Sequence, residues 1–107
     1  MEISIDQSVQ PTCLRLTGTF NIEAVLDAKP RLLAPIDASA DGLALDLSQV
    51  DDIDTAGLQL LVLAMRHAMA AGKPLRAANI SEPVRRLVTL YRLSDHFDTA
   101  QPQREAP

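Results

Sequence analysis

The segment from Leu43 to Gly72 restricts the possible folds more than any other part of the chain. Its first part, LALDLS, has leucines at alternate positions 43, 45 and 47, which is typical of a short buried strand. Residues 56–71 are rich in Leu, Ala and Met, which favour helix, and Gly72 stands where a helix C-terminal cap is expected. A buried strand followed closely by a long helix predicts an α/β fold with helices covering a sheet.

Two segments near the N-terminus, Met1–Ile5 and Thr12–Thr17, carry apolar residues at alternate positions. Polar residues and Pro11 lie between them, so they predict two strands joined as a hairpin. A further short strand is expected at Leu75–Ala78, and Ser81 is placed to cap a last helix. That helix has apolar residues at one-face spacing, at Val84, Leu87, Val88 and Tyr91.

Between the hairpin and the Leu-rich strand, Asn21 is placed to cap a helix. Its expected apolar stripe contains Ile22, Val25 and Leu26. Pro30 and Pro35 should kink or end this helix, because proline lacks the N–H that an interior helical position needs. The full order is strand, strand, helix, strand, helix, strand, helix, which predicts a compact α/β domain with a small mixed sheet covered by helices.

The chain has 107 residues, of which 47% are hydrophobic, and this is enough for one domain with a modest core. We expect the domain to span residues 1–98. Residues 99–107 are polar and include two prolines, so we expect them to form a disordered C-terminal tail.

The balance of charges argues against nucleic acid as a partner, since 10 basic and 14 acidic side chains give a net charge of -4. With Cys13 as the only cysteine, no internal disulfide can form, and a reducing, cytoplasmic setting fits best. The N-terminus MEISIDQSVQ lacks a basic region followed by an apolar run, and no apolar stretch approaches the roughly 20 residues that span a bilayer. We expect neither export nor direct membrane insertion.

The most informative segment is LALDLSQVDDIDTAG, residues 43–57, where a buried strand is expected to lead through an acidic loop into the strongest helix. Asp54 or Thr55 could cap that helix, and Gly57 would allow a close approach of another backbone or of a phosphate. A phosphate on Thr55 would meet the positive end of the helix dipole and unpaired N–H donors. It would also add about two negative charges and bulk to a surface where a partner could pack.

The same helix offers a candidate docking face beside Thr55. Helical spacing places an expected core stripe at Leu58, Leu61, Val62, Met65 and Met69. The opposite side then carries an apolar strip, with Leu60 and Leu63 as its large side chains and Ala56, Gln59, His67 and Ala70 around them. A Leu-rich helix can also be simply a stable helix, so two interpretations remain open: a docking strip, or leucines with no role in binding.

Other chemistries have weaker support in the sequence. Asp46, Asp51, Asp52 and Asp54 suggest a divalent metal, but the calcium-loop spacing with its distal Glu is absent, and acidic residues before a helix are stabilised by its dipole. His67 and His96 belong to no ligand or catalytic motif. There is no G-x-S-x-G elbow, G-x-G-x-x-G pattern or P-loop. We therefore expect no enzyme activity, no metal and no cofactor.

The residues also resemble the STAS domain family, found in anti-sigma factor antagonists and in sulfate transporters. LDLSQVDDIDTAGLQLL at Leu45–Leu61 is similar to the family signature, RLTGTF at Arg15–Phe20 to its second strand and turn, and Ile80–Leu93 to its last conserved helix. The resemblance covers most of Met1–Phe97.

For bacterial antagonists, this resemblance implies a serine kinase that is itself the anti-sigma factor and that phosphorylates the hydroxyl after the signature Asp, releasing the complex. Carried over by position, the phosphorylation site is Thr55, beside Asp54. The expected partner-binding residues are Asp54, Thr55, Ala56, Gly57, Gln59, Leu60 and Leu63, and the expected partner is an anti-sigma factor or serine kinase. The resemblance leaves an alternative open: an accessory subunit that binds the ATPase of a phospholipid-transport ABC complex, or a chemosensory-associated protein, without a phosphorylation cycle.

Overall fold

A computed structural model describes residues 1–40, 42–73, 75–93 and 97. The elements in chain order are β1 (Glu2–Asp6), β2 (Cys13–Phe20), α1 (Ile22–Ala38), β3 (Leu43–Ile53), α2 (Thr55–Ala70), β4 (Leu75–Ile80) and α3 (Glu82–Leu90). This is the order that the sequence patterns predict. The expected tail at residues 99–107 and His96 lie outside the described residues.

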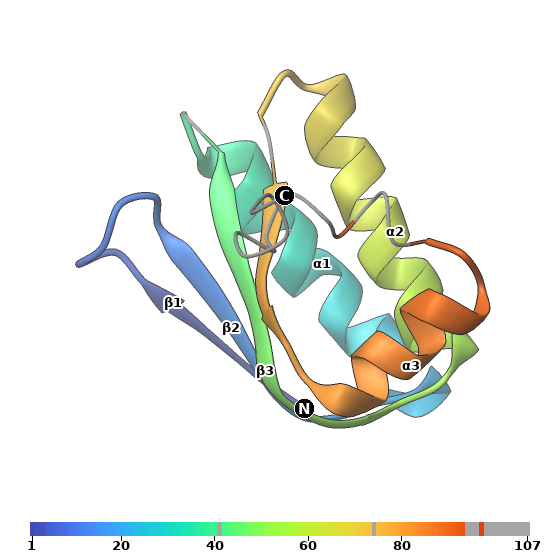
Figure 1. Cartoon of the computed structure of the whole chain (residues 1–107). Helices are drawn as coiled ribbons and strands as arrows, with labels where there is room; N and C mark the ends of the chain where they lie inside the picture. The colour runs from blue at the N-terminus through green and yellow to red at the C-terminus, as the bar shows by residue number, and fades with distance from the viewer. Residues whose placement is uncertain (41, 74, 94–96, 98–107) are drawn as a thin grey trace, which may run out of the picture.

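The four strands of the described residues form one sheet in the order β1-β2-β3-β4. β1 pairs with β2 antiparallel, as the predicted hairpin requires, whereas β2 with β3 and β3 with β4 are parallel. The two parallel steps run in the same direction across the sheet, so right-handed crossovers place both connecting helices on the same face. Figure 1 shows α1 and α2 side by side on that face, with α3 beside the lower part of α2. The predicted mixed sheet covered by helices is confirmed.

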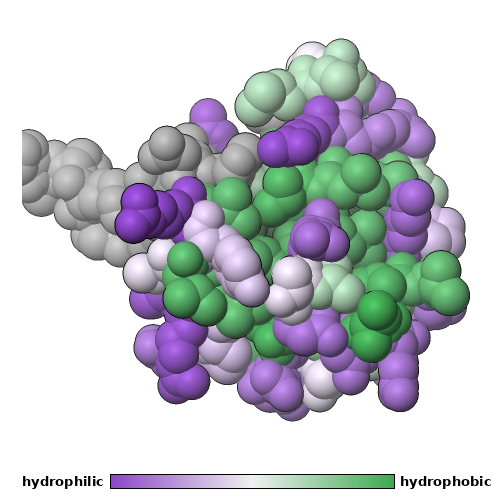
Figure 2. Space-filling view, turned by 90° about the vertical axis from the view of Figure 1, so that its right-hand side faces the viewer, coloured by the Kyte–Doolittle hydropathy of each residue, from purple (hydrophilic) through white to green (hydrophobic). Residues whose placement is uncertain are grey.

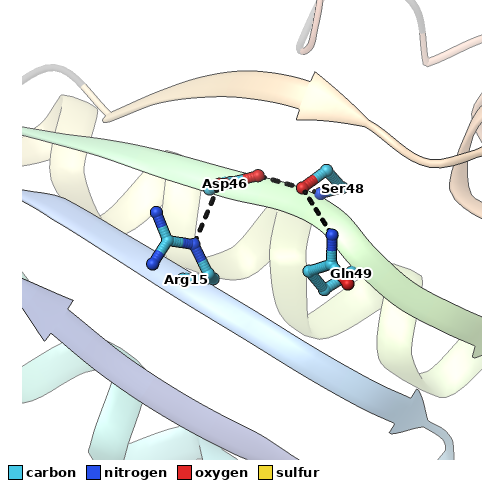
Figure 3. Close-up of polar contacts among 4 residues, drawn as sticks. All are labelled: Arg15, Asp46, Ser48 and Gln49. Atoms are coloured by element: carbon cyan, nitrogen blue, oxygen red, sulfur yellow. Dashed lines mark hydrogen bonds and ion pairs between the residues drawn. The ribbon is translucent and has the colours of Figure 1, made fainter.

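The core lies between the sheet and the helices. The strands contribute alternate side chains, among them Leu14 and Leu16 from β2 and Leu45 and Leu47 from β3, all fully buried. The opposite face of the sheet is polar. There Arg15 on β2 pairs with Asp46 on β3, as Figure 3 shows with the helices behind the strands.

Helix α1 continues through both prolines and runs to Ala38. The expectation that Pro30 or Pro35 could end the helix is therefore wrong. The carbonyls that lose their helical donor belong to Leu26 and Arg31, two exposed residues whose backbone solvent can hydrate. The expected apolar stripe is also wrong. The buried face of α1 consists of Ala28, Leu32 and Ile36, whereas Ile22 is 66% exposed and Leu26 is 86% exposed.

Strand β3 is longer than predicted, because the expected acidic loop is strand up to Ile53. Asp51 and Asp52 are exposed positions of that strand, and only Asp54 separates it from α2. The pairing with β2, which continues to Phe20 opposite Ile53, holds the acidic segment in the sheet. Backbone pairing thus overrides the loop-forming preference of the aspartates.

Both later helices end in a Schellman motif. At the end of α2, Gly72 (φ 73°) donates to the Met69 carbonyl, and Lys73 donates to the Ala68 carbonyl, which confirms the predicted glycine cap. After α3, Arg92 takes the glycine position with φ 57°. Tyr91, expected on the buried stripe of the last helix, follows the end of α3 and is 48% exposed, so that expectation is wrong.

Candidate functional site

The site begins where β3 gives way to α2, and Asp54 organises this junction. Its Oδ1 accepts a hydrogen bond from the Gly57 N–H at 3.0 Å, and its Oδ2 accepts one from the Ile22 N–H at 2.9 Å. Asp54 therefore caps α2 and also holds the first residue of α1. The pKa of Asp54 is lowered chiefly by the hydrogen bond from Gly57; burial opposes this effect, and the bond from Ile22 lowers the pKa further.

Gly57 is required by close packing at the same junction. A Cβ at this position would overlap the backbone carbonyl oxygen of Phe20, at the end of β2. The same carbonyl accepts a hydrogen bond from the Asp54 N–H at 3.3 Å. Gly57 therefore lets the first turn of α2 lie directly against the neighbouring strand, and its role here is close approach of a backbone.

Thr55 is the first residue of α2 and is exposed. The cap is supplied by Asp54, so the Thr55 hydroxyl has no capping duty. Its Oγ1 lies 3.4 Å from the Oη of Tyr91, a separation longer than the usual hydroxyl-to-hydroxyl hydrogen bond. The structure thus places the candidate phosphorylation site on the surface, with a second hydroxyl facing it.

Leu60 corrects the predicted docking strip, because it is buried, with 6% of its surface exposed. His67, two helical turns further on, contacts Asp37 of α1 at 2.7 Å between Nε2 and Oδ1, so this side of α2 faces α1. Leu60 lies on the same side and packs between the helices. The helix is covered by the sheet below and by α1 beside it, and an argument from one core stripe misses the second covered side.

The exposed surface of α2 consequently differs from the predicted one. Gln59 and Leu63 are exposed, Leu63 by 42%, while Ala56 and His67 are half-buried. On the expected core stripe, Leu58, Leu61 and Met65 are buried. Val62 is half-buried instead, and Met69 is 75% exposed because it lies near the free end of the helix.

A groove of about 440 Å³ runs along the exposed side of α2, between this helix and the residues after α3. It is lined by Thr55, Leu58, Gln59, Val62, Leu63, Arg66, Tyr91 and Leu93. Figure 2 views this side of the molecule and shows hydrophobic side chains gathered across it, with hydrophilic ones set among and around them. The groove thus joins an apolar surface to the hydroxyl of Thr55.

The groove adds five residues that the predicted site did not contain: the buried Leu58 at its base, and Val62, Arg66, Tyr91 and Leu93. Helical spacing could have found two of them, since Val62 and Arg66 lie seven and eleven residues after Thr55, on the same side of the helix. No local pattern connects Tyr91 with Thr55. They are 36 residues apart, and only the packing of α3 against α2 brings them together.

The aspartates that suggested a metal have separate partners. Asp46 pairs with Arg15, Asp51 accepts a hydrogen bond from the Thr19 hydroxyl at 3.1 Å, and Asp54 caps α2. Within residues 1–40, 42–73, 75–93 and 97, His, Cys, Asp and Glu side chains form no group of three that could hold a metal ion. None of the helices in the same residues is long and apolar enough to cross a bilayer.

Comparison with protein families identifies the family of this chain. The family model described as "Mlab, STAS domain" matches residues 3–99. The chain belongs to the STAS domain family. In this STAS domain the family-like signature at Leu45–Leu61 corresponds to β3, the Asp54 cap and the first two turns of α2. A search of curated proteins returned no match.

Solved structures agree with this fold. SpoIIAA, an anti-sigma factor antagonist, matches in its unphosphorylated form with a TM-score of 0.72 and 17% identity, covering 90% of this chain and 85% of that one. A candidate anti-sigma factor antagonist from Thermotoga maritima matches with a TM-score of 0.71 and 21% identity, covering 90% and 81%. The phosphorylated form of SpoIIAA, described as a Bacillus cell fate determinant, matches with a TM-score of 0.68 and 16% identity, covering 90% of this chain and 88% of that one. The STAS domain thus has the fold of anti-sigma factor antagonists.

Proposed function

We propose that this STAS domain is a non-enzymatic partner-switching regulator whose unmodified Thr55 permits docking of a protein partner and whose phosphorylated Thr55 prevents it. One observation carries the proposal: Asp54 provides the helix cap, which leaves the Thr55 hydroxyl exposed and without a structural duty at the edge of an apolar groove. A threonine needed as a cap could not be modified without loss of the helix start.

The docking surface in this proposal is the groove and its rim. It keeps Thr55, Gln59 and Leu63 from the predicted partner-binding residues, and it replaces the buried Leu60 with Val62, Arg66 and Tyr91. Asp54 and Gly57 act from beneath, by fixing the start of α2. Ala56 is half-buried on the α1 side and forms the margin of the surface.

The chemistry requires a second protein. A kinase holding a nucleoside triphosphate would transfer its terminal phosphoryl group, so that a new O–P bond forms at the Thr55 Oγ1 and the bond to the nucleoside diphosphate breaks. The hydroxyl proton would pass to a base on the kinase. The added dianion would stand at the mouth of an apolar groove, where it blocks close packing by bulk and by its cost of desolvation.

The structural relatives support the partner class. The neighbours are described as anti-sigma factor antagonists, and SpoIIAA has been solved both with and without phosphorylation. By this likeness we propose an anti-sigma factor or a serine kinase, in the cytoplasm, as the partner of Thr55 and its groove.

The test is a pull-down with the full chain from the cells that express it, followed by phosphopeptide mapping of the recovered chain. The recovered partner is then purified and titrated with the unmodified chain, Thr55→Ala and Thr55→Glu. We expect Thr55→Ala to bind like the unmodified chain and Thr55→Glu to bind at least tenfold more weakly, about 1.4 kcal/mol. Equal binding of all three would exclude the switch.

A second candidate function is favoured by the charges around Thr55. Asp51, Asp52 and Asp54 stand close to it in sequence, and the Gly57 N–H that could have held a phosphate is already bound by Asp54. Such surroundings suit a hydroxyl that is never phosphorylated. The groove would then hold a constitutive partner, such as the ATPase of a phospholipid-transport ABC complex. Recovery of a transporter ATPase, with no phosphopeptide containing Thr55, would favour this function over the switch.

A further inference from the structure

Thr55 and Tyr91 form a pair of facing hydroxyls at one end of the groove, with 3.4 Å between their oxygens. Neither hydroxyl is needed for the fold. Thr55 leaves the cap to Asp54, and Tyr91 is 48% exposed on the surface. Both hydroxyls are therefore free to change partners without a change in the fold.

The backbone under Tyr91 is held firmly, although its ring is exposed. The Tyr91 N–H donates to the Leu87 carbonyl at 3.0 Å, and the Leu93 N–H donates to the Val88 carbonyl at 2.8 Å. Arg92 between them adopts φ 57°, the left-handed conformation that closes this type of helix end. The turn therefore fixes where the ring starts, and rotation of the side chain alone decides where the phenolic oxygen lies.

We propose that Tyr91 reads the state of Thr55: it faces the free hydroxyl, and it donates its phenolic O–H to a phosphoryl group attached there. This inference rests on the phosphorylation proposed above. A phosphoryl group needs hydrogen-bond donors, and the Gly57 N–H is already taken by Asp54. The Tyr91 O–H is a donor whose oxygen lies 3.4 Å from the oxygen that would carry the phosphorus.

This bond would reshape the groove. A phosphoryl oxygen reaches beyond the Thr55 Oγ1, so the phenol, which now lies 3.4 Å from that atom, has to move outward to accept a phosphate between them. Tyr91 and Thr55 line the same groove with Val62 and Leu63, and a displaced ring changes the shape of its mouth. Phosphorylation would therefore act on a partner through charge and through the position of Tyr91.

The test uses the full chain with phosphothreonine placed at position 55 by chemical ligation, so no kinase is needed. Its phosphate is titrated by 31P NMR in the native sequence and in the Tyr91→Phe variant, which keeps the ring and removes the donor. A donated hydrogen bond favours the dianion, so we expect the phosphate of the variant to titrate at a pH higher by roughly 0.5. Identical titrations in the two chains would overturn the proposal.

A matched control places phosphothreonine at Thr17, an exposed residue of β2 on the face opposite to Leu16. There Tyr91→Phe should leave the titration unchanged. Tyrosine emission gives a second readout, because the chain contains one tyrosine and no tryptophan. Phosphate at position 55 should change the quenching of this emission by acrylamide, whereas phosphate at position 17 should not.

These outcomes are separable from the fate of the proposed function. If cells never phosphorylate Thr55, the partner switch fails while the titration difference persists in the ligated chain. If the titrations coincide while Thr55→Glu still releases the partner, the switch stands and the role of Tyr91 is refuted.

Discussion

The carboxylate of Asp54 accepts a hydrogen bond from the backbone N–H of Ile22, 32 residues earlier, while it caps its own helix through Gly57. One side chain thereby holds the first turns of two parallel crossover helices in register. Asp54, which precedes the candidate phosphorylation site, therefore has the structural role at this junction, and the Thr55 hydroxyl is not needed for the cap.

Asp54→Ala should therefore destabilise the domain by about 1–2 kcal/mol, the cost of losing a good helix cap. Urea denaturation measures this, with Ser81→Ala as the matched control. Ser81 is the N-cap residue of α3, but its hydroxyl makes no cap hydrogen bond and is buried without a partner in the described part of the chain. Its loss should cost less than about 0.5 kcal/mol. Equal effects of the two substitutions would contradict the structural role given to Asp54.

Gly57→Ala should destabilise the domain by about 3 kcal/mol or more, because the new methyl group meets the rigid backbone carbonyl of Phe20. Gly72→Ala is the comparison. Nothing lies near a Cβ at Gly72, and only its φ of 73° opposes the change, so its cost should be about 1 kcal/mol. Thermal unfolding of both variants gives the order, and a larger loss for Gly72 would refute the close approach at Gly57.

Leu60→Asp and Leu63→Asp should separate folding from docking. Leu60 is 6% exposed, so an unpaired carboxylate there should cost several kcal/mol or prevent folding. Leu63 is 42% exposed, so its variant should remain folded by circular dichroism and lose the partner. Val9→Asp is the control, since Val9 is 44% exposed in the turn between β1 and β2. A Leu63→Asp chain that binds like Val9→Asp would rule out the groove as the docking surface.

The Arg15 and Asp46 pair predicts a dependence of stability on pH. Burial raises the pKa of Asp46, but hydrogen bonds from Ser48 and the pairing with Arg15 outweigh it, so the pKa lies below its ordinary 3.8. Because the folded-state pKa is the lower one, this carboxylate contributes stability above pH 3.8, and the contribution is lost as the pH falls below it.

Arg15→Leu removes the guanidinium and leaves the burial of Asp46 in place. Acid unfolding should then begin at a higher pH than in the native chain. Circular dichroism measured between pH 2 and 7, at intervals of roughly half a pH unit, gives the transition. In Asp46→Asn the same substitution of Arg15 should no longer shift the acid transition. A shift of the same size in the Asn variant would show that Asp46 is not the responsible group.

Local patterns were sufficient for the order of the elements and for the start of the site. The strand with alternating leucines, the Leu-Ala-Met helix and its end at Gly72 were predicted correctly. These features depend on backbone geometry and on residues close in sequence, so they can be recognised from the sequence alone. Two failures have tertiary causes. Strand β3 extends through Asp51 and Asp52 because β2 pairs with it, and α1 continues through Pro30 and Pro35 because the carbonyls that lose their donor lie on its exposed face.

What the sequence alone determined is the fold class, the helix that follows the acidic segment, and Thr55 at its first turn. Only the tertiary structure decided that Leu60 is covered by α1, that Asp54 releases Thr55 from capping, and that Tyr91 stands opposite its hydroxyl. The reason is physical: periodicity reports that a helix has a buried side, but how many sides are buried, and which distant side chain arrives at the exposed one, depends on how separate elements pack.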